Sequence, residues 1–343
     1  MKVRLRLFIA ILISPCFVMA QDNSDPPIFE GPKMSRSQTP EYPPSELRRG
    51  NEAWVMLNFM VDTDGKSFEP TVIGSSGSER FEQAALNALR RSIFSPAKYL
   101  GEPVESSAYY KYVFKLAGVP INAGSEFFQN FESLVKLVEE KNQQEAQQLL
   151  QSMGDKGSSN LYENALLNLA RFQYAAAYGT SLQQMKYLND ALAYEGRDGR
   201  SGYLPVEAAQ QARRGLFPLE IENKRYREAL VTYEKIVESG DVVAVNNYKS
   251  TYDQVIELRD SDTSYFVPGT TDNNGLWSIK LFKTSFHLNN LENKIDELKL
   301  RCQRKYIFFA FAPGNQYQIP ESWGSCTLQV LGDANVKFEL DQF

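Results

Sequence analysis

The sequence contains a single histidine, His287, in 343 residues, and this scarcity removes most imidazole-based chemistry. It also contains no phosphate-binding loop and no cysteines and histidines at metal-ligand spacing. The stretch from Gly74 to Ser78 lacks the final glycine of a nucleophile elbow, and Ser78 is better suited to cap a helix. Carboxylates are plentiful, but no pattern joins them into an acid–base pair. We therefore predict that the protein is not an enzyme and holds neither a metal nor a cofactor.

An excess of positive charge is also missing. The chain has 37 lysines and arginines against 42 acidic residues, a net charge of −5. The charge becomes −8 if the first 20 residues, with their three cations Lys2, Arg4 and Arg6, are removed. Because binding to a phosphate backbone depends on many cations, we do not expect nucleic acid as a partner.

Long hydrophobic runs are absent after the first 20 residues. The apolar stretch from Leu7 to Ala20 has 14 residues and is interrupted by Pro15, whereas a membrane-spanning helix needs about 20. With its basic start and the small residue before Gln21, the segment 1–20 is typical of a cleaved signal peptide. The alternative is that residues 1–20 stay uncleaved as a membrane anchor. We expect the protein to contact a membrane only in that case. Cys16 does not fit lipidation, because Pro15 stands where a small residue is required.

The first part of the remaining chain predicts a small α+β unit. Residues 21–45, rich in proline, serine and acidic residues, predict an extended lead-in. Residues 46–118 show the order strand, strand, helix, strand, with strands over 54–62 and 68–73, a helix after Ser78 and a strand from Ser107. The first strand is apolar on both sides, so we expect its second face to meet another layer. Pro70 in the second strand indicates an edge or a bulge.

Residues 121–262 differ, because their apolar positions recur at helical spacing. The stretch 224–235 resembles half of a tetratricopeptide repeat. The spacing from Ala191 to Ala229 is 38 residues, however, rather than the roughly 34 of that repeat. We predict a tetratricopeptide-like array of helical hairpins, with a concave surface for a second protein.

Residues 264–343 return to a period of two and predict a compact all-β module. Cys302 and Cys326 each fall on the apolar side of their own predicted strand. In an oxidising compartment such a pair predicts a disulfide across the core. The alternative is two separate buried thiols.

An ordered set of motifs in residues 42–116 resembles the C-terminal domain of the TonB energy-transducer family. The motifs are Tyr42-Pro43, Asp64-Gly65, Val72-Ile73-Gly74-Ser75-Ser76-Gly77, Phe81-Glu82-Gln83-Ala84-Ala85-Leu86, Arg90-Arg91-Ser92-Ile93-Phe94-Ser95-Pro96-Ala97, Gly101-Glu102-Pro103-Val104 and a last strand ending at Phe114. The resemblance implies a three-stranded sheet packed on one helix, at the envelope of a Gram-negative cell. It also implies binding of an extended peptide from an outer-membrane receptor beside the last strand.

The resemblance places this docking surface on residues 107–115. An edge strand offers unpaired N–H and C=O groups, which an added strand satisfies. The residues that we expect to contact the partner are Tyr42, Pro43, Tyr109, Lys111, Val113 and Lys115. The alternative is an unused edge whose residues are simply exposed.

The chain also departs from the family pattern. Family transducers carry an N-terminal membrane helix that couples to the ExbB–ExbD motor, followed by a long proline-rich spacer. Residues 21–45 would reach only about 85 Å when fully extended. We therefore predict a periplasmic adaptor that docks an extended peptide by strand addition, in association with transmembrane transport.

Two alternatives stay open. The first is a transducer anchored in the inner membrane through uncleaved residues 1–20. The second is glycan binding by the C-terminal β module, although aromatic residues at this density usually fill cores. The aromatic residues that would stack on a glycan are Tyr306, Tyr317, Trp277 and Trp323.

Overall fold

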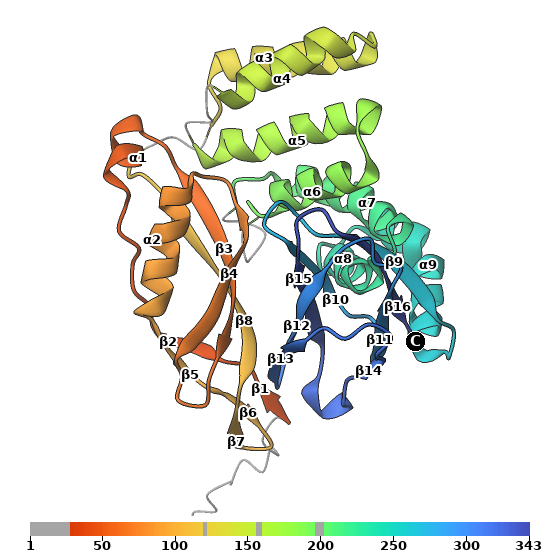
Figure 1. Ribbon diagram of the computed structural model, residues 1–343. Helices are drawn as coiled ribbons and strands as arrows, with labels where there is room; N and C mark the ends of the chain where they lie inside the picture. The colour runs from red at the N-terminus through yellow and green to blue at the C-terminus, as the bar shows by residue number, and fades with distance from the viewer. Residues whose placement is uncertain (1–27, 119–121, 156–159, 196–201) are drawn as a thin grey trace, which may run out of the picture.

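The computed structural model describes residues 28–118, 122–155, 160–195 and 202–343. The predicted signal peptide and the start of the predicted lead-in therefore lie outside the described residues. A strand-and-helix part comes first, then stacked helices, then a sheet-rich part (Figure 1). This order confirms the predicted α+β fold class. We call the three parts the N-terminal module (28–118), the helical region (122–260) and the C-terminal module (265–343).

The N-terminal module is built on an antiparallel sheet whose central strand, β3 (Ala53–Val61), lies between β4 (Ser67–Ser75) and β8 (Ser106–Phe114). One face of this sheet is covered by α2 (Glu79–Arg90), whose apolar side packs on alternate residues of β3 (Figure 1). The pairing of β3 with β4 shifts register around Pro70, as its sequence position predicted. The predicted order strand, strand, helix, strand is therefore confirmed.

The lead-in segment is paired with other strands rather than simply extended. β1 (Phe29–Glu30) pairs with β6 (Ala97–Tyr99), which pairs in turn with β7 (Glu102–Val104). β2 (Lys33–Arg36) pairs with β5 (Ile93–Ser95). Strands of two to four residues are too short to show a period-two pattern, so the sequence did not predict them.

The helical region stacks its helices in chain order, so that successive helices pack against each other (Figure 1). Its helices are α3 (Ser125–Glu139), α4 (Gln143–Asp155), α5 (Leu161–Tyr178), α6 (Ser181–Leu192), α7 (Val206–Glu222), α8 (Tyr226–Glu238) and α9 (Val242–Asp260). The all-helical character is confirmed, and the repeat class stays a prediction.

The C-terminal module consists of two four-stranded sheets, ordered β10-β15-β12-β13 and β14-β11-β16-β9. Residues from both sheets form one shared hydrophobic core. The strands are β9 (Tyr265–Thr270), β10 (Leu276–Lys280), β11 (Ser285–Asn289), β12 (Ile295–Cys302), β13 (Tyr306–Ala310), β14 (Tyr317–Gln318), β15 (Cys326–Gly332) and β16 (Lys337–Gln342). Cys302 and Cys326 are paired across β12 and β15, are both buried in this core, and form a disulfide bond.

The second face of the N-terminal sheet is covered by the rest of the chain. Trp54 of β3 packs edge-on against Tyr194, just after α6, with ring centroids 5.9 Å apart. Farther along the same face, the guanidinium of Arg301 in β12 donates hydrogen bonds to Asn58 and Glu69. The apolar second side of the first strand predicted such a layer, and both other modules contribute to it.

Candidate functional site

The outer edge of β8 is the feature that the sequence singled out as a docking surface. Among the described residues, β8 pairs with β3 and with no other strand. The lead-in strands β1 and β2 pair with β6 and β5 instead, so they leave this edge uncovered. No strand of the described residues therefore occupies the outer edge of β8, and a further strand could pair there.

The direction of the backbone groups on β8 follows from its neighbour β3. The N–H of Trp54 donates to the hydroxyl of Ser76, and the C=O of Trp54 accepts from the N–H of Ser76, so both groups point toward β4. Antiparallel pairs alternate between bonded and non-bonded positions, so Val113, opposite Trp54, directs its own N–H and C=O away from β3. The same alternation applies to Tyr109, opposite Asn58. Two of the predicted contact residues thus present outward backbone groups.

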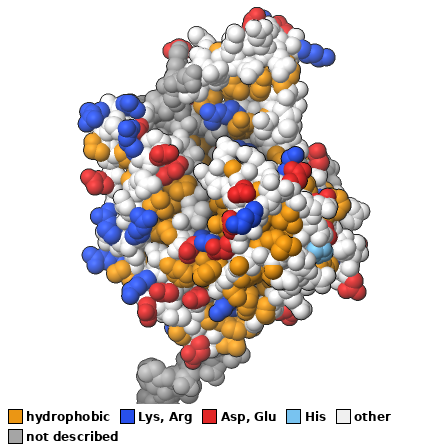
Figure 2. All heavy atoms as spheres, viewed as in Figure 1, with side chains coloured by type: hydrophobic (Ala, Val, Ile, Leu, Met, Phe, Trp, Pro, Cys, Tyr) orange, Lys and Arg blue, Asp and Glu red, His pale blue; other side chains and the backbone are white. Residues whose placement is uncertain are grey.

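The side chains of Tyr109 and Val113 are 49% and 43% exposed. They lie on the same face of the sheet as Trp54 and Asn58, because directly paired residues share a face. This is the face that meets the helical region and the C-terminal module. Figure 2 shows hydrophobic side chains gathered where β8 and β13 lie, while the lysines and arginines of this view collect over the side of α2.

The two predicted lysines contact the helical region. The ammonium group of Lys111 donates to the carbonyl oxygen of Ala193 at 2.6 Å. The ammonium group of Lys115 lies 5.4 Å from the centroid of the Tyr203 ring. The edge of β8 therefore borders the segments that follow α6 and precede α7, rather than open solvent along its whole length.

A cavity of about 270 Å³ lies at the N-terminal half of β8, beside Ser107 and Tyr109. Its opposite wall includes Arg227 and Val231 of α8 and Lys280 of β10. Sequence reasoning missed these wall residues, which come from two other modules and carry no motif. Only their placement against β8 makes them part of the site.

Tyr42 and Pro43, the other two predicted contact residues, are packed into the N-terminal module. Pro43 is buried at the start of α1 (Pro44–Arg49). The Tyr42 ring lies edge-on to Phe81 and Phe114, and its hydroxyl donates to a backbone carbonyl. Burial, with smaller effects of two nearby glutamates, raises the pKa of Tyr42 to about 12. The structure thus places Tyr42 next to Phe114, at the far end of β8 from Tyr109, and its role as a contact residue stays a prediction.

Of the four aromatic residues considered for glycan stacking, one is buried and the other three, Tyr306, Tyr317 and Trp323, are half-buried. Trp277 is buried and lies edge-on to Phe338. Tyr317 stacks on Phe309, and Tyr306 lies edge-on to Phe68 of β4. Trp323 packs against the same core. They fill the core and the contact with the N-terminal module.

In the described part of the chain, no helix combines the length and the apolar character that crossing a bilayer requires.

Ser78 stands at the N-cap position of α2, as predicted, but its hydroxyl donates to Glu46 rather than capping the helix.

Comparison with known proteins bears on the N-terminal module. The model of the family described as Gram-negative bacterial TonB protein C-terminal matches residues 38–116. Protein TonB of Vibrio cholerae is 33% identical over 96 residues, which are 28% of this chain and 39% of that protein. Protein tonB2 of Pseudomonas aeruginosa is 46% identical over 59 residues, which are 17% of this chain and 22% of that protein.

Among solved structures, the solution NMR structure of the Pseudomonas aeruginosa TonB CTD is 25% identical. The matched region covers 26% of this chain and 92% of the chain in that structure, with a TM-score of 0.24. The chain thus spans well under half the length of the two curated relatives. The family match confirms that the N-terminal module is a TonB C-terminal-like domain.

Proposed function

We propose that this protein is an adaptor of the Gram-negative cell envelope that binds an extended peptide by strand addition along β8. The observation that carries the proposal is the outward N–H and C=O groups of Tyr109 and Val113 on an edge that no described strand covers. An added strand would satisfy these groups, and alternate side chains would supply the specificity. The match to the TonB C-terminal family supports a partner at the outer membrane, in association with transport.

The bound peptide would lie in a groove rather than on an open edge. One wall of the groove is β8, and the opposite wall includes Arg227, Val231 and Lys280 beside the cavity. A peptide added here would therefore contact all three modules. This opposite wall is what distinguishes the proposed site from a bare edge strand.

We also propose a second protein partner, which would contact the helical region. At the turn between α8 and α9, Val237, Val242 and Val243 are 50%, 68% and 60% exposed. Exposed apolar side chains that form a contiguous patch often mark protein contacts. We propose that this turn contributes to the second contact of the adaptor.

Photo-crosslinking in the native host tests the docking proposal. Replacing Tyr109 by p-benzoylphenylalanine keeps an aromatic ring at the edge of β8 and should give a crosslink to an extended segment of an outer-membrane protein. The control is the same substitution at Ile73, which is 50% exposed on β4, the opposite edge of the sheet. Crosslinks of equal yield and identity from both positions would refute a specific role for β8.

A second test removes the backbone donor alone. Val113→Pro deletes an N–H that points away from β3, so the pairing of β3 with β8 should survive and peptide capture should fail. Circular dichroism and the melting temperature check that the variant is folded. A folded Val113→Pro protein that still gives the full Tyr109 crosslink would contradict strand addition.

The anchored-transducer role depends on residues 1–20, which lie outside the described residues. Mass spectrometry of the mature N-terminus separates the two roles. A chain that begins at Gln21 supports the adaptor, and a chain that retains residues 1–20 supports the transducer.

A further inference from the structure

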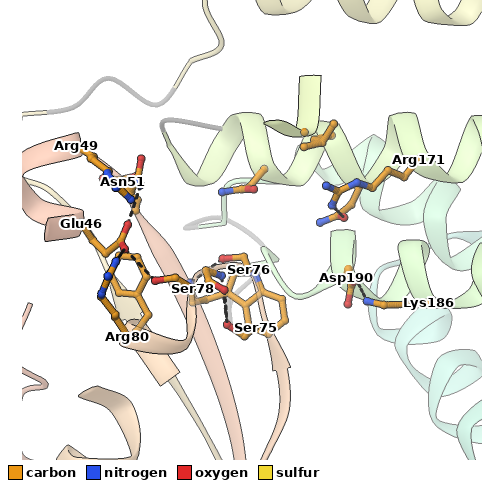
Figure 3. Close-up of a pocket in the computed structure, with 18 residues that line it drawn as sticks. Glu46, Arg49, Asn51, Ser75, Ser76, Ser78, Arg80, Arg171, Lys186 and Asp190 are labelled. Atoms are coloured by element: carbon orange, nitrogen blue, oxygen red, sulfur yellow. Dashed lines mark hydrogen bonds and ion pairs between the residues drawn. The ribbon is translucent and has the colours of Figure 1, made fainter. Parts of the chain in front are cut away.

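A polar cavity lies between the N-terminal module and the helical region, away from β8. Its volume is about 430 Å³, which falls in the range of small-molecule sites. Figure 3 shows its two banks: Glu46, Arg49 and Arg80 lie on one side, and Arg171 and Lys186, from α5 and α6, on the other. The cavity shares no lining residue with β8.

The carboxylates around this cavity already have donors. Glu46 accepts hydrogen bonds from Asn51 at 2.8 Å and Ser78 at 3.0 Å, and the Asn51 bond chiefly holds the pKa of Glu46 below its usual value. Glu52 accepts from two backbone N–H groups, at 2.8 and 3.1 Å. Asp190 is paired with Lys186. The negative groups of the walls are thus engaged with the protein itself.

Donors, in contrast, remain available. The side chain of Asn164 is part of a residue only 9% exposed, lines the cavity, and has no hydrogen-bond partner among the described residues. The guanidinium of Arg171 has five N–H donors, and its one hydrogen bond within the described chain goes to Asn168 at 3.1 Å. The Asn164 amide is reached from the cavity and can therefore form a hydrogen bond to a molecule that binds there.

The start of α2 adds to this preference. Ser78 lines the cavity at the N-cap of α2, a helix of 12 residues. The N-terminus of a helix carries partial positive charge and favours anions. Arg49 and Arg80 lie on the same side of the cavity (Figure 3), and Arg80 is already paired with Glu46 at 3.3 Å.

We propose that this cavity binds a small anionic molecule rich in oxygen acceptors, whose carboxylate or phosphate group contacts Arg171 and Asn164. Within the part of the chain that the structure describes, Arg171 has unused N–H donors and the Asn164 amide has no partner, so a ligand with oxygen acceptors matches these two residues. The site joins the TonB-like domain to the helical region, and its ligand would link the two. The proposal does not depend on strand addition at β8.

Isothermal titration calorimetry on the full chain tests the site. Citrate and inorganic phosphate are titrated separately at constant ionic strength, with the neutral triol glycerol as a control. We expect one-site, saturable binding of at least one of the two anions and none of glycerol, and the stronger anion identifies the preferred group. Absence of saturable binding of both anions at 10 mM would overturn the proposal.

Three variants locate the binding. Arg171→Gln should weaken the affinity at least tenfold, and Asn164→Leu, which keeps the side-chain volume, should weaken it several-fold. Arg259→Gln, on exposed α9 far along the chain, is the matched control and should bind as the wild type does. Melting temperatures check folding, and Asn164→Leu decides the matter if Arg171→Gln fails to fold. Wild-type affinity in the folded Arg171→Gln and Asn164→Leu variants would place the anion elsewhere and overturn the site.

Discussion

Arg301 is the side chain whose removal should most weaken the attachment of the C-terminal module to the N-terminal sheet. It is 2% exposed, and its Nε donates to Oε1 of Gln329 at 2.8 Å. Its Nη1 donates to Oδ1 of Asn58 at 3.2 Å and to the carbonyl oxygen of Glu69 at 2.6 Å. The perturbation that we choose is Arg301→Met, which keeps the length of the side chain and removes every donor.

The magnitude follows from the acceptors that the substitution leaves behind. Asn58 and Gln329 are 2% and 4% exposed, so water does not easily replace the guanidinium. A buried acceptor without a donor costs about 1–3 kcal/mol, so two of them predict a loss of about 3 kcal/mol in the free energy of unfolding. The Glu69 carboxylate adds little, because it is 39% exposed and keeps Lys299 at 2.8 Å.

Urea unfolding, followed by circular dichroism and by tryptophan fluorescence, measures this loss. Agreement of the two probes shows whether the three modules unfold in one transition. The control is Lys299→Met, on the same strand and with the same partner Glu69, for which we expect at most about 1 kcal/mol. An Arg301→Met loss no larger than the Lys299→Met loss would refute the reasoning.

Three further predictions concern stability. Burial raises the pKa of Glu220 from 4.5 to about 8, so the folded chain keeps a proton that the unfolded chain loses. The free energy of unfolding should therefore fall as the pH rises from about 4.5 to about 8. In Glu220→Gln the midpoint of urea unfolding should fall less over this pH range. Replacing Cys302 and Cys326 by alanine opens a loop of 24 residues and should cost about 3 kcal/mol, a difference that a reducing agent abolishes. Gly65 and Gly50 both have positive φ, but only at Gly65 would an added Cβ lie 2.0 Å from a carbonyl oxygen of β5. Gly50→Ala should therefore lower the free energy of unfolding by about 1 kcal/mol, and Gly65→Ala should lower it by about 2 kcal/mol more. Melting temperatures of the two variants measure this difference.

Each of these three has an outcome that contradicts it. An unchanged pH profile in Glu220→Gln would mean that another group dominates the dependence. A cysteine-free variant as stable as the oxidised protein would remove the role of the disulfide. Equal losses in the two glycine variants would mean that β5 moves freely to make room.

The sequence predicted most of the N-terminal sheet because local patterns suffice there. The alternation in β3 showed two apolar faces, and the structure places α2 on one and other modules on the second. What the alternation could not predict was the identity of the second layer. Tyr194 and Arg301 lie more than a hundred residues away from Trp54 and Asn58, and only the assembled fold brings them together.

In the candidate site, too, the sequence predicted one part and not the other. The position of β8 as an outer strand followed from the family resemblance. Its opposite wall did not, because Arg227 and Lys280 belong to a helix and a strand with no distinguishing motif.

The paired lead-in has a mechanical consequence. β1 and β2 are short antiparallel partners of β6 and β5, and tension applied near Phe29 would separate their residue pairs one after another. Unzipping would stop at Tyr42, whose ring is wedged against Phe81 and Phe114. Residues 28–41, once unpaired, would have a contour length of about 45 Å while the central sheet stays folded. The lead-in segment would therefore extend under tension before the force reaches the central sheet.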